Sequence, residues 1–250
     1  MRAVAALIVL AAATAHAHPR FEPTDLELED SGTMEIDVQV GVVHGTDASR
    51  VVVPDFEVDL GIVPGVELDI DGAFGVEGHR PGPTFFDHQQ RDNLWISAKL
   101  GLWDDQDPLT HDAWAIGVQA GPKLPIAPDT HGIGAEALLL VARMQGRVHL
   151  VAQVGALVDP YLTATPRPWG IEAGLDLDLD LDHHDTWSLL GEVGGLWYGS
   201  ADASQLSATA GIQYSPSQKI DLSLVVMVGV LDGSDPYGVL FGVSPKLSLW

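Results

Sequence analysis

The sequence predicts an all-β protein, a transmembrane antiparallel up-and-down β-barrel of about twelve strands with long outer loops and short periplasmic turns. Three observations favour this fold: long segments that alternate apolar and polar residues, an apolar stretch at the N-terminus, and a high hydrophobic content in a strongly acidic chain. The alternation is clearest from Gly170 to Leu181, which reads GIEAGLDLDLDL. Successive side chains of a strand point to opposite faces, so this segment has one apolar and one acidic face. A soluble sandwich would bury the apolar face, whereas a closed barrel in a bilayer turns it towards lipid and keeps the carboxylates in a watery interior.

Residues 1–17 have the pattern of a secretory signal peptide. An early arginine precedes an apolar run from Ala3 to Ala13, and Ala15-His16-Ala17 is a small-x-small cleavage site. The run is too short to span a bilayer as a helix. We therefore expect a periplasmic N-terminal segment at residues 18–32 and a transmembrane barrel at residues 33–250, in the outer membrane of a Gram-negative bacterium. The lack of cysteine suits an envelope protein without a disulfide framework.

The composition combines strong acidity with a high apolar content. The chain carries 35 Asp and Glu against 12 Lys and Arg, a formal net charge of −23, yet 46% of its residues are hydrophobic and its mean hydropathy is +0.15. Such a polyanion would repel phosphate, so a nucleic-acid partner is excluded. The hydrophobic content excludes a disordered chain. The partners expected are outer-membrane lipid, the barrel-assembly machinery and a small-molecule solute.

Period-two alternation, interrupted by Gly, Pro and Asp, predicts twelve strands. They span Thr33–Val43, Val52–Gly61, Gly65–Glu77, Asn93–Trp103, Ala113–Lys123, Ile133–Arg143, Arg147–Val158, Trp169–Leu181, Thr186–Tyr198, Ser204–Tyr214, Lys219–Leu231 and Tyr237–Leu249. Most are long enough for a tilted strand to cross a bilayer, which takes about 9–11 residues. An even number of strands places both chain ends on the periplasmic side.

The predicted connections alternate in length, as outer-membrane barrels require: short at the periplasmic end and long outside. The periplasmic turns would be Ile62–Pro64, Met144–Gly146, Asp182–Asp185 and Ser215–Gln218, and the long outer loops would be Gly78–Asp92, Leu124–Gly132 and Asp159–Pro168. The connection Asp104–Asp112 breaks the rule, because it is long and falls at the periplasmic end.

Aromatic residues are predicted to form two belts at the level of the lipid headgroups. The periplasmic belt would hold Trp103, Trp114, Trp187, Tyr214 and Trp250, and the outer belt Trp95, Trp169, Trp197, Tyr198 and Tyr237. Trp95 and Trp103 share parity with Ser97 and Lys99, so an inward orientation of these two tryptophans is the alternative.

Polar residues of one parity are predicted to line the lumen. The candidates are Glu35, Asp37, Glu57, Asp59, Glu67, Asp69, Lys99, Arg147, Asp176, Asp178, Asp180, Lys219 and Asp221. Most of the acidic ones belong to the periplasmic halves of their strands. Glu136 and Arg143 share one strand but have opposite parity, so a bulge or a strand-end effect is expected there.

The acidic residues of the second hairpin are expected to face one another across its short turn. This pairing would place Glu57 opposite Asp69, and Asp59 opposite Glu67. Directly opposed like charges cost up to about 1 kcal/mol each, so cations should lie nearby. The candidate cations are Lys99, Lys246, Arg147 and Lys219.

These charges allow three roles. An ion-pair network would fill and rigidify the lumen, an acidic constriction would favour cations over anions, and the carboxylates could hold a divalent cation. Barrel width grows with strand number, so about twelve strands predict a narrow or partly plugged passage. The favoured function is an outer-membrane channel or transporter for small solutes, without a cofactor or a resident metal. A closed structural or adhesive barrel with a salt-bridged lumen is the alternative.

A lipid-modifying outer-membrane enzyme is the third function considered, because some such enzymes use Ser with His on a barrel face. His149, Ser188 and Ser207 are available, but no Gly-x-Ser-x-Gly elbow is present and no catalytic residue is predicted. His183 and His184 lie in a tight turn, where adjacent imidazoles seldom aim at one ion, so a solvated turn is favoured over a metal site.

The segments PDFEVDLG (Pro54–Gly61), VELDI (Val66–Ile70) and LWISAK (Leu94–Lys99), together with the closing Gly-rich hairpins, resemble the meta-pathway phenol-degradation family of outer-membrane barrels, often labelled as transporters. The resemblance spans Arg20 to Trp250. It implies an outer-membrane location and the passage of small hydrophobic or aromatic compounds, with no catalytic residue to assign.

The C-terminus departs from the usual pattern of such barrels, which end in an aromatic residue with apolar residues at alternate preceding positions. Trp250 is in phase with Lys246 and Ser244 instead. A bulge at Pro245 would reset the parity, and recognition by the assembly machinery depends on that outcome.

Overall fold

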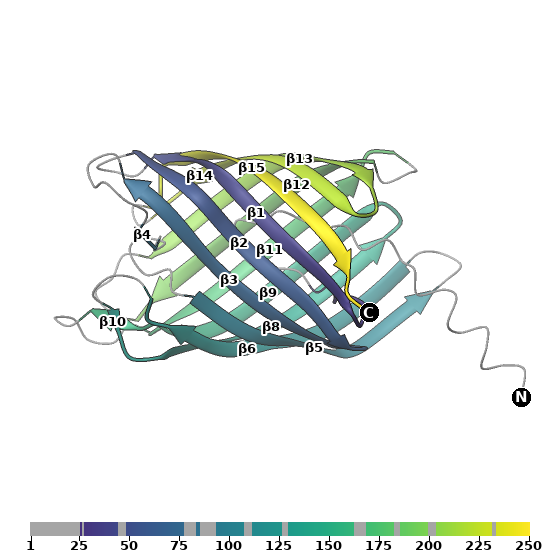
Figure 1. The fold of residues 1–250 in the computed structure, drawn as a ribbon, viewed down its shortest axis with the longest axis horizontal. Helices are drawn as coiled ribbons and strands as arrows, with labels where there is room; N and C mark the ends of the chain where they lie inside the picture. The colour runs from purple at the N-terminus through teal and green to yellow at the C-terminus, as the bar shows by residue number, and fades with distance from the viewer. Residues whose placement is uncertain are drawn as a thin grey trace, which may run out of the picture.

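The structure, a computed structural model, describes residues 26, 28–44, 49–77, 84–85, 94–107, 112–126, 130–162, 169–182, 186–199, 204–231 and 234–250. Within these ranges the chain forms a closed antiparallel β-barrel of twelve long strands (Figure 1). The predicted fold class is therefore confirmed. The described residues include no helix that is long and apolar enough to cross a membrane. The predicted signal peptide, residues 1–17, lies outside the described residues.

The long strands match the predicted ones closely. They are β1 (Thr33–His44), β2 (Ser49–Val63), β3 (Val66–Glu77), β5 (Leu94–Asp107), β6 (Asp112–Leu124), β8 (Gly134–Gln145), β9 (Val148–Val158), β11 (Trp169–Asp180), β12 (Trp187–Tyr198), β13 (Gln205–Ser217), β14 (Ile220–Gly229) and β15 (Tyr237–Ser248). The short strand β4 (Thr84–Phe85) pairs with β3, and β7 (Thr130–His131) pairs with β10 (Tyr161–Leu162). In Figure 1, β4 and β10 lie at the end of the barrel opposite the C-terminus.

Pairing between β1 and β15 closes the barrel. The register is the same from Thr33 opposite Ser248 to His44 opposite Tyr237, with no shift between the pairs Glu35–Lys246 and Val38–Val243. The backbone N–H of Leu249 donates to the carbonyl of Gly32 over 2.7 Å. The register of β15 against β14 is constant up to its last pair, Ile220 opposite Pro245, and the backbone N–H of Lys246 donates to the carbonyl of Lys219 over 2.9 Å. The bulge considered at Pro245 is therefore wrong, and the inward parity of Lys246 continues that of Ser244 without a reset.

The connection that broke the length rule is short in the structure. β5 continues to Asp107, β6 begins at Asp112, and these two residues pair with each other, so only residues 108–111 separate the strands. The predicted strand ended early because a register shift between Gly101 and Trp103 interrupts the alternation there. With this correction all five connections at the periplasmic end are short, as the barrel topology requires.

The second hairpin has a different register from the predicted one. Val63 pairs with Val66 across Pro64-Gly65, and a register shift lies between Gly61 and Val63. Asp59 consequently stands opposite Asp69, Glu57 opposite Asp71, and Gly61 opposite Glu67. The prediction was wrong by two residues because β2 continues to Val63, which the left-handed conformation of Gly65 (φ 80°) permits by closing a two-residue turn.

Replacing Gly65 by alanine is expected to lower the free energy of unfolding by about 1–2 kcal/mol, because an L-residue is strained at this φ. A Cβ at Gly65 would meet only the carbonyl of Gly101, at 3.9 Å, so the cost is conformational and not steric. Denaturant unfolding of the refolded barrel measures it. Gly191→Ala is the matched control, since a Cβ there meets nothing within 4 Å and φ is not positive. Equal stability of the two variants would contradict this account of the turn.

Alternation separates the two faces of the barrel wall. On β14, Leu224, Val226 and Val228 are exposed on the outside, whereas Asp221 and Ser223 are buried. Exposed aliphatic and aromatic side chains recur in the same way on the other long strands, for example Leu175 and Leu177 on β11. Such an outward apolar band is the surface that a barrel presents to lipid.

The two charged residues of β8 that have opposite parity lie on opposite faces without a bulge, because the register of β8 is continuous against both of its neighbours. Glu136 is buried inside. Arg143 is on the outer face near the periplasmic end, where it lies 3.5 Å from the carboxylate of Asp112 and 4.9 Å from the ring centroid of Trp114. The predicted strand-end effect therefore explains Arg143.

Most of the aromatic residues assigned to belts are exposed at strand ends. At the periplasmic end these are Trp103, Trp114, Trp187 and Trp250, and at the outer end Trp169, Trp197 and Tyr237. Two residues assigned to the outer belt face inward instead. Trp95 is only 3% exposed, and the hydroxyl of Tyr198 donates to Asp159 over 2.9 Å. Both lie at strand positions whose side chains point inward, and this orientation outweighs the preference of aromatic rings for the membrane interface.

Candidate functional site

Six of the predicted lumen residues gather on three neighbouring strands and form what we call the acidic wall: Glu35 and Asp37 on β1, Glu57 and Asp59 on β2, and Glu67 and Asp69 on β3. Cross-strand pairing places Glu35 beside Asp59 and Asp37 beside Glu57. Asp59 in turn stands beside Asp69. Like charges therefore lie directly opposite each other at three places, which is unfavourable unless cations are close.

Lys99 is the first cation of this cluster. It pairs with Glu67 across β3 and β5, and its Nζ lies 2.7 Å from Glu67 Oε1, with the two side chains 2% and 1% exposed. Next to this pair, Ser97 and Gln119 donate to Asp69 Oδ2 over 3.1 and 2.7 Å. A buried charge persists only when paired and hydrogen-bonded, so these contacts fix Glu67 and Asp69 in place.

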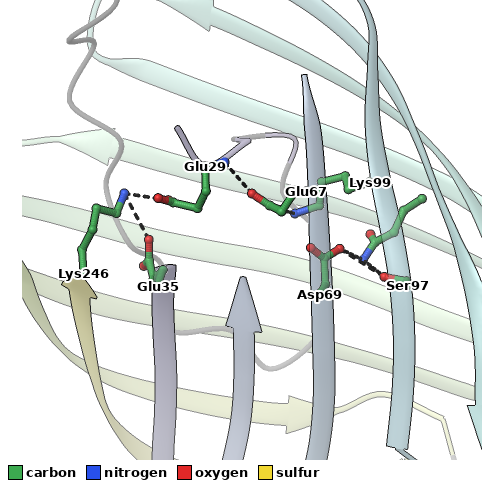
Figure 2. A network of polar contacts seen from close by, with 8 residues as sticks. Glu29, Glu35, Glu67, Asp69, Ser97, Lys99 and Lys246 are labelled. Carbon is green, nitrogen blue, oxygen red and sulfur yellow. Dashed lines mark hydrogen bonds and ion pairs between the residues drawn. The ribbon is translucent and has the colours of Figure 1, made fainter. Parts of the chain in front are cut away.

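Lys246 is the second cation and comes from the strand that closes the barrel. Its Nζ lies 3.1 Å from Glu35 Oε2 and 2.7 Å from Glu29 Oε1. Figure 2 shows these side chains and those around Lys99 converging inside the barrel. Glu29 also donates its backbone N–H to Glu67 Oε2. Glu29, which precedes the first strand, thus connects the Lys246 side of the acidic wall with Glu67 on β3.

The acidic wall also contains two groups of oxygens that a hard cation could share. Ligand atoms of Asp37, Glu57 and Asp59 lie within 4.8 Å of one another, and so do those of Asp59, Glu67 and Asp69. Carboxylate oxygens are the ligands that Ca²⁺ prefers. The arrangement therefore fits the divalent-cation role considered above.

The acidic residues of β11 lie apart from the acidic wall. Asp178 and Asp180 are buried; Asp180 accepts a hydrogen bond from Ser188 over 3.0 Å and lies 3.7 Å from His149 Nε2. Asp176 is half-buried and stands opposite Glu192 on β12. His149 and Ser188 are thus the neighbours of these acids.

The remaining predicted residues lie near the periplasmic rim. Arg147 is in the turn between β8 and β9 and donates to the carbonyl of Leu181 over 3.4 Å. Lys219 is exposed in the turn before β14, so the structure does not place its side chain in the acidic wall, whereas Asp221 two residues later is buried. Of the four candidate cations, Lys99 and Lys246 are the ones that the structure joins to the acidic wall. His183 and His184 lie outside the described residues.

A second polar cluster at the outer end was not predicted as a unit. Lys123 on β6 lies 2.5 Å from Glu136 and 3.5 Å from Asp159, and Asp159 accepts the hydrogen bond from Tyr198. The inward parity of Lys123 was the available signal. Asp159 follows the end of β9, and Tyr198 was expected in the outer aromatic belt. The alternation alone therefore did not predict their contact.

Part of the interior is apolar. Trp95, Leu138 and Leu140 form a buried cluster with Leu26, which precedes the first strand, and Ala115, Ala142 and Val151 pack against them. We call Trp95, Leu138 and Leu140 the apolar wall. Sequence reasoning missed it because the segment Leu138–Val141 is apolar on both parities, so the alternation does not show which side faces inward.

The fold is similar to that of solved outer-membrane barrels. The NanC porin structure superposes with a TM-score of 0.60 at 12% identity, covering 85% of this chain and 100% of that chain. The translocator domain of the autotransporter NalP from Neisseria meningitidis gives a TM-score of 0.45 at 11% identity, with 89% and 91% covered. At these identities the likeness shows the fold, and the second score is too low to add an argument.

No protein-family model matches the sequence, and no curated protein matches it either. Membership of the meta-pathway phenol-degradation family therefore stays a prediction, and the lipid-modifying enzyme stays the third alternative. The closed twelve-stranded barrel with an outward apolar band has the architecture of Gram-negative outer-membrane proteins, and the outer membrane is the location that it indicates.

Proposed function

We propose that the protein is an outer-membrane channel that passes small solutes through a narrow lumen with an acidic side. The observation that carries this proposal is the acidic wall, in which six carboxylates from three adjacent strands share the inner face of a closed barrel. Charges fixed beside a passage concentrate ions of the opposite sign and discourage like ions. The channel should therefore prefer cations and cationic solutes.

The lysines of the cluster offset only part of its charge. Within the described part of the chain, the acidic wall and Glu29 bring seven carboxylates together with Lys99 and Lys246. The two lysines hold the carboxylates in fixed positions, which gives the passage a stable electrostatic profile. An excess of negative charge is what a cation-preferring constriction requires.

The apolar wall supports a second feature of the proposed solutes. Trp95, Leu138 and Leu140 are buried in one cluster with Leu26, and once Leu26 moved away they would give an aliphatic or aromatic group a surface on which to rest. A tryptophan ring also attracts organic cations through its face. The solutes favoured are therefore small compounds with a hydrophobic or aromatic part, which agrees with what the family resemblance implies.

Reversal potentials across planar bilayers under a salt gradient test the channel. The wild-type protein, refolded without residues 1–17, is expected to pass cations in preference to anions. Asp59→Asn combined with Asp69→Asn should reduce the cation-to-anion permeability ratio several-fold, because it removes two charges of the acidic wall. Asp104→Asn, at an exposed position of β5, should leave the ratio unchanged. A wild-type preference for anions, or an unchanged ratio in the double variant, would contradict the proposal.

The second candidate is a closed structural barrel, and the close packing of its interior favours it. Gln119, Gln213 and Leu140 are almost completely buried, so the lumen is well filled around them. In this case the ion pairs of Lys99 and Lys246 serve stability alone. A folded barrel that carries no current at any voltage would favour this candidate over the channel.

A further inference from the structure

A short described part of the chain that precedes β1 lies inside the barrel. We call Leu26 and residues 28–30 the inserted segment. Glu29 lies between Lys246 on β15 and Glu67 on β3, and Leu26 reaches the apolar wall on β5 and β8. Going round the barrel from β15 to β8, these contacts span seven of the twelve long strands. The segment therefore crosses the interior and does not follow one wall.

One anchor of the inserted segment is polar. The carboxylate of Glu29 binds Lys246 over 2.7 Å while its backbone N–H donates to Glu67, and the residue is only 6% exposed. Both partners belong to the ion pairs that organise the acidic wall. Glu29 is thus built into that network, although it belongs to no strand.

The other anchor is apolar. Leu26 is 6% exposed and belongs to one buried cluster with Trp95, Leu138 and Leu140. The groups that bind Glu29 are charged, whereas these side chains are apolar and form a matched place for a leucine. If Leu26 left, the apolar wall would lose the side chain that covers it.

Three glycines on the inner face make room for the segment. A Cβ at Gly61 would lie 2.2 Å from the carbonyl oxygen of Asp30, a Cβ at Gly101 would lie 2.8 Å from Leu28 Cδ1, and a Cβ at Gly117 would lie 2.3 Å from Leu26 Cδ1. These glycines belong to β2, β5 and β6. Barrel positions on three strands therefore fit this segment, and the contact at Gly61 involves backbone, which cannot rotate away.

We propose that the inserted segment is a plug that closes the periplasmic end of the barrel and must be displaced before solutes pass. The proposal rests on the channel function proposed above. Its contacts are non-covalent and of the kind that release reversibly: they include the packing of Leu26 and Leu28, the ion pair of Glu29 with Lys246 and the hydrogen bond from the Glu29 N–H to Glu67. The plug also explains why the interior groups around it are almost completely buried in a barrel of this width.

Cysteine labelling tests the docking of the segment without relying on current. The chain has no cysteine, so Leu26→Cys supplies the sole thiol. In the folded barrel it should react with a water-soluble maleimide at least about tenfold more slowly than Ile133→Cys, whose native side chain is 60% exposed. Adding Gly61→Val, which places a side chain where the Asp30 carbonyl lies, should remove most of this protection. Gly191→Val is the matched control, because a Cβ there meets nothing within 4 Å.

Glu29→Gln gives a second way to loosen the plug, by removing the charge that binds Lys246 and leaving the barrel wall unchanged. It should also accelerate the labelling of Leu26→Cys, and heat-modifiable migration on a gel shows which variants have folded. Equal labelling of Leu26→Cys and Ile133→Cys, or no acceleration by either folded variant, would overturn the plug.

Planar-bilayer conductance then tests the closing role. Gly61→Val and Glu29→Gln should each conduct at least about twice as much as the wild type, because the inserted segment would be displaced for a larger fraction of the time, whereas Gly191→Val should match the wild type. Equal, measurable currents in all four proteins would overturn the plug while keeping the channel. Zero current in all four would overturn the channel function instead, and the labelling rates would still decide whether the segment is docked.

Discussion

Lys99→Met is expected to lower the free energy of unfolding by about 3–5 kcal/mol, because removing one partner of a buried ion pair leaves the other charge uncompensated. Lys99 and Glu67 are 2% and 1% exposed, and their charged atoms are 2.7 Å apart. Asp69 is a neighbour of this pair, and Asp59 stands opposite Asp69. The variant would therefore leave several carboxylates repelling one another. Urea unfolding of the barrel in lipid vesicles, followed by tryptophan fluorescence and band migration, gives the measurement.

Two comparisons separate the loss of the ion pair from the loss of any lysine. Lys219→Met removes an exposed lysine from a turn and should change stability by less than about 0.5 kcal/mol. Lys99→Met combined with Glu67→Gln removes both charges of the pair and should recover part of the lost stability. If the single variant Lys99→Met is as stable as Lys219→Met, the acidic wall does not depend on this lysine for its cohesion.

The barrel could be predicted from the sequence because its alternate residues must face lipid and the residues between them must face the polar interior. The segment from Trp169 to Leu181 was expected as a strand and forms β11, Trp169–Asp180, with Asp178 and Asp180 buried and Leu175 and Leu177 exposed. Lipid outside and polar groups inside impose the same period along the whole strand, so a few exceptions do not hide it. Turn composition then placed most strand ends within one or two residues.

Contacts that depend on register or on residues outside the strands could not be predicted in the same way. A two-residue extension of β2 to Val63 changed the partner of Glu57 from Asp69 to Asp71 without altering which face either residue occupies. Lys246 was recognised as a candidate cation, but its contact with Glu29 depends on where the chain before β1 lies. Leu26 belongs to no periodic segment, so alternation gave no reason to place it against the apolar wall.

Leu224→Arg is expected to destabilise the barrel in lipid by about 2–4 kcal/mol, because a charge on the lipid-facing side of a strand is most costly near the middle of the bilayer. Leu224 is near the centre of β14 (Ile220–Gly229), and its side chain is 50% exposed on the outer face. Its neighbours Ser223 and Val225 point inward and are buried, so the substitution changes the outer surface and leaves the interior intact. Equilibrium folding into vesicles against urea gives the free energy.

Val230→Arg is the comparison that makes this a test of membrane depth. Val230 is 61% exposed and follows the outer end of β14, so arginine there should cost at most about 1 kcal/mol, since charges near the interface reach the headgroups. A soluble barrel would tolerate arginine equally at both positions, because water would cover both. The difference between the two variants therefore reports whether hydrocarbon surrounds the middle of β14. Equal and small effects would mean that lipid does not contact this face, and the assignment to the outer membrane would fail with it.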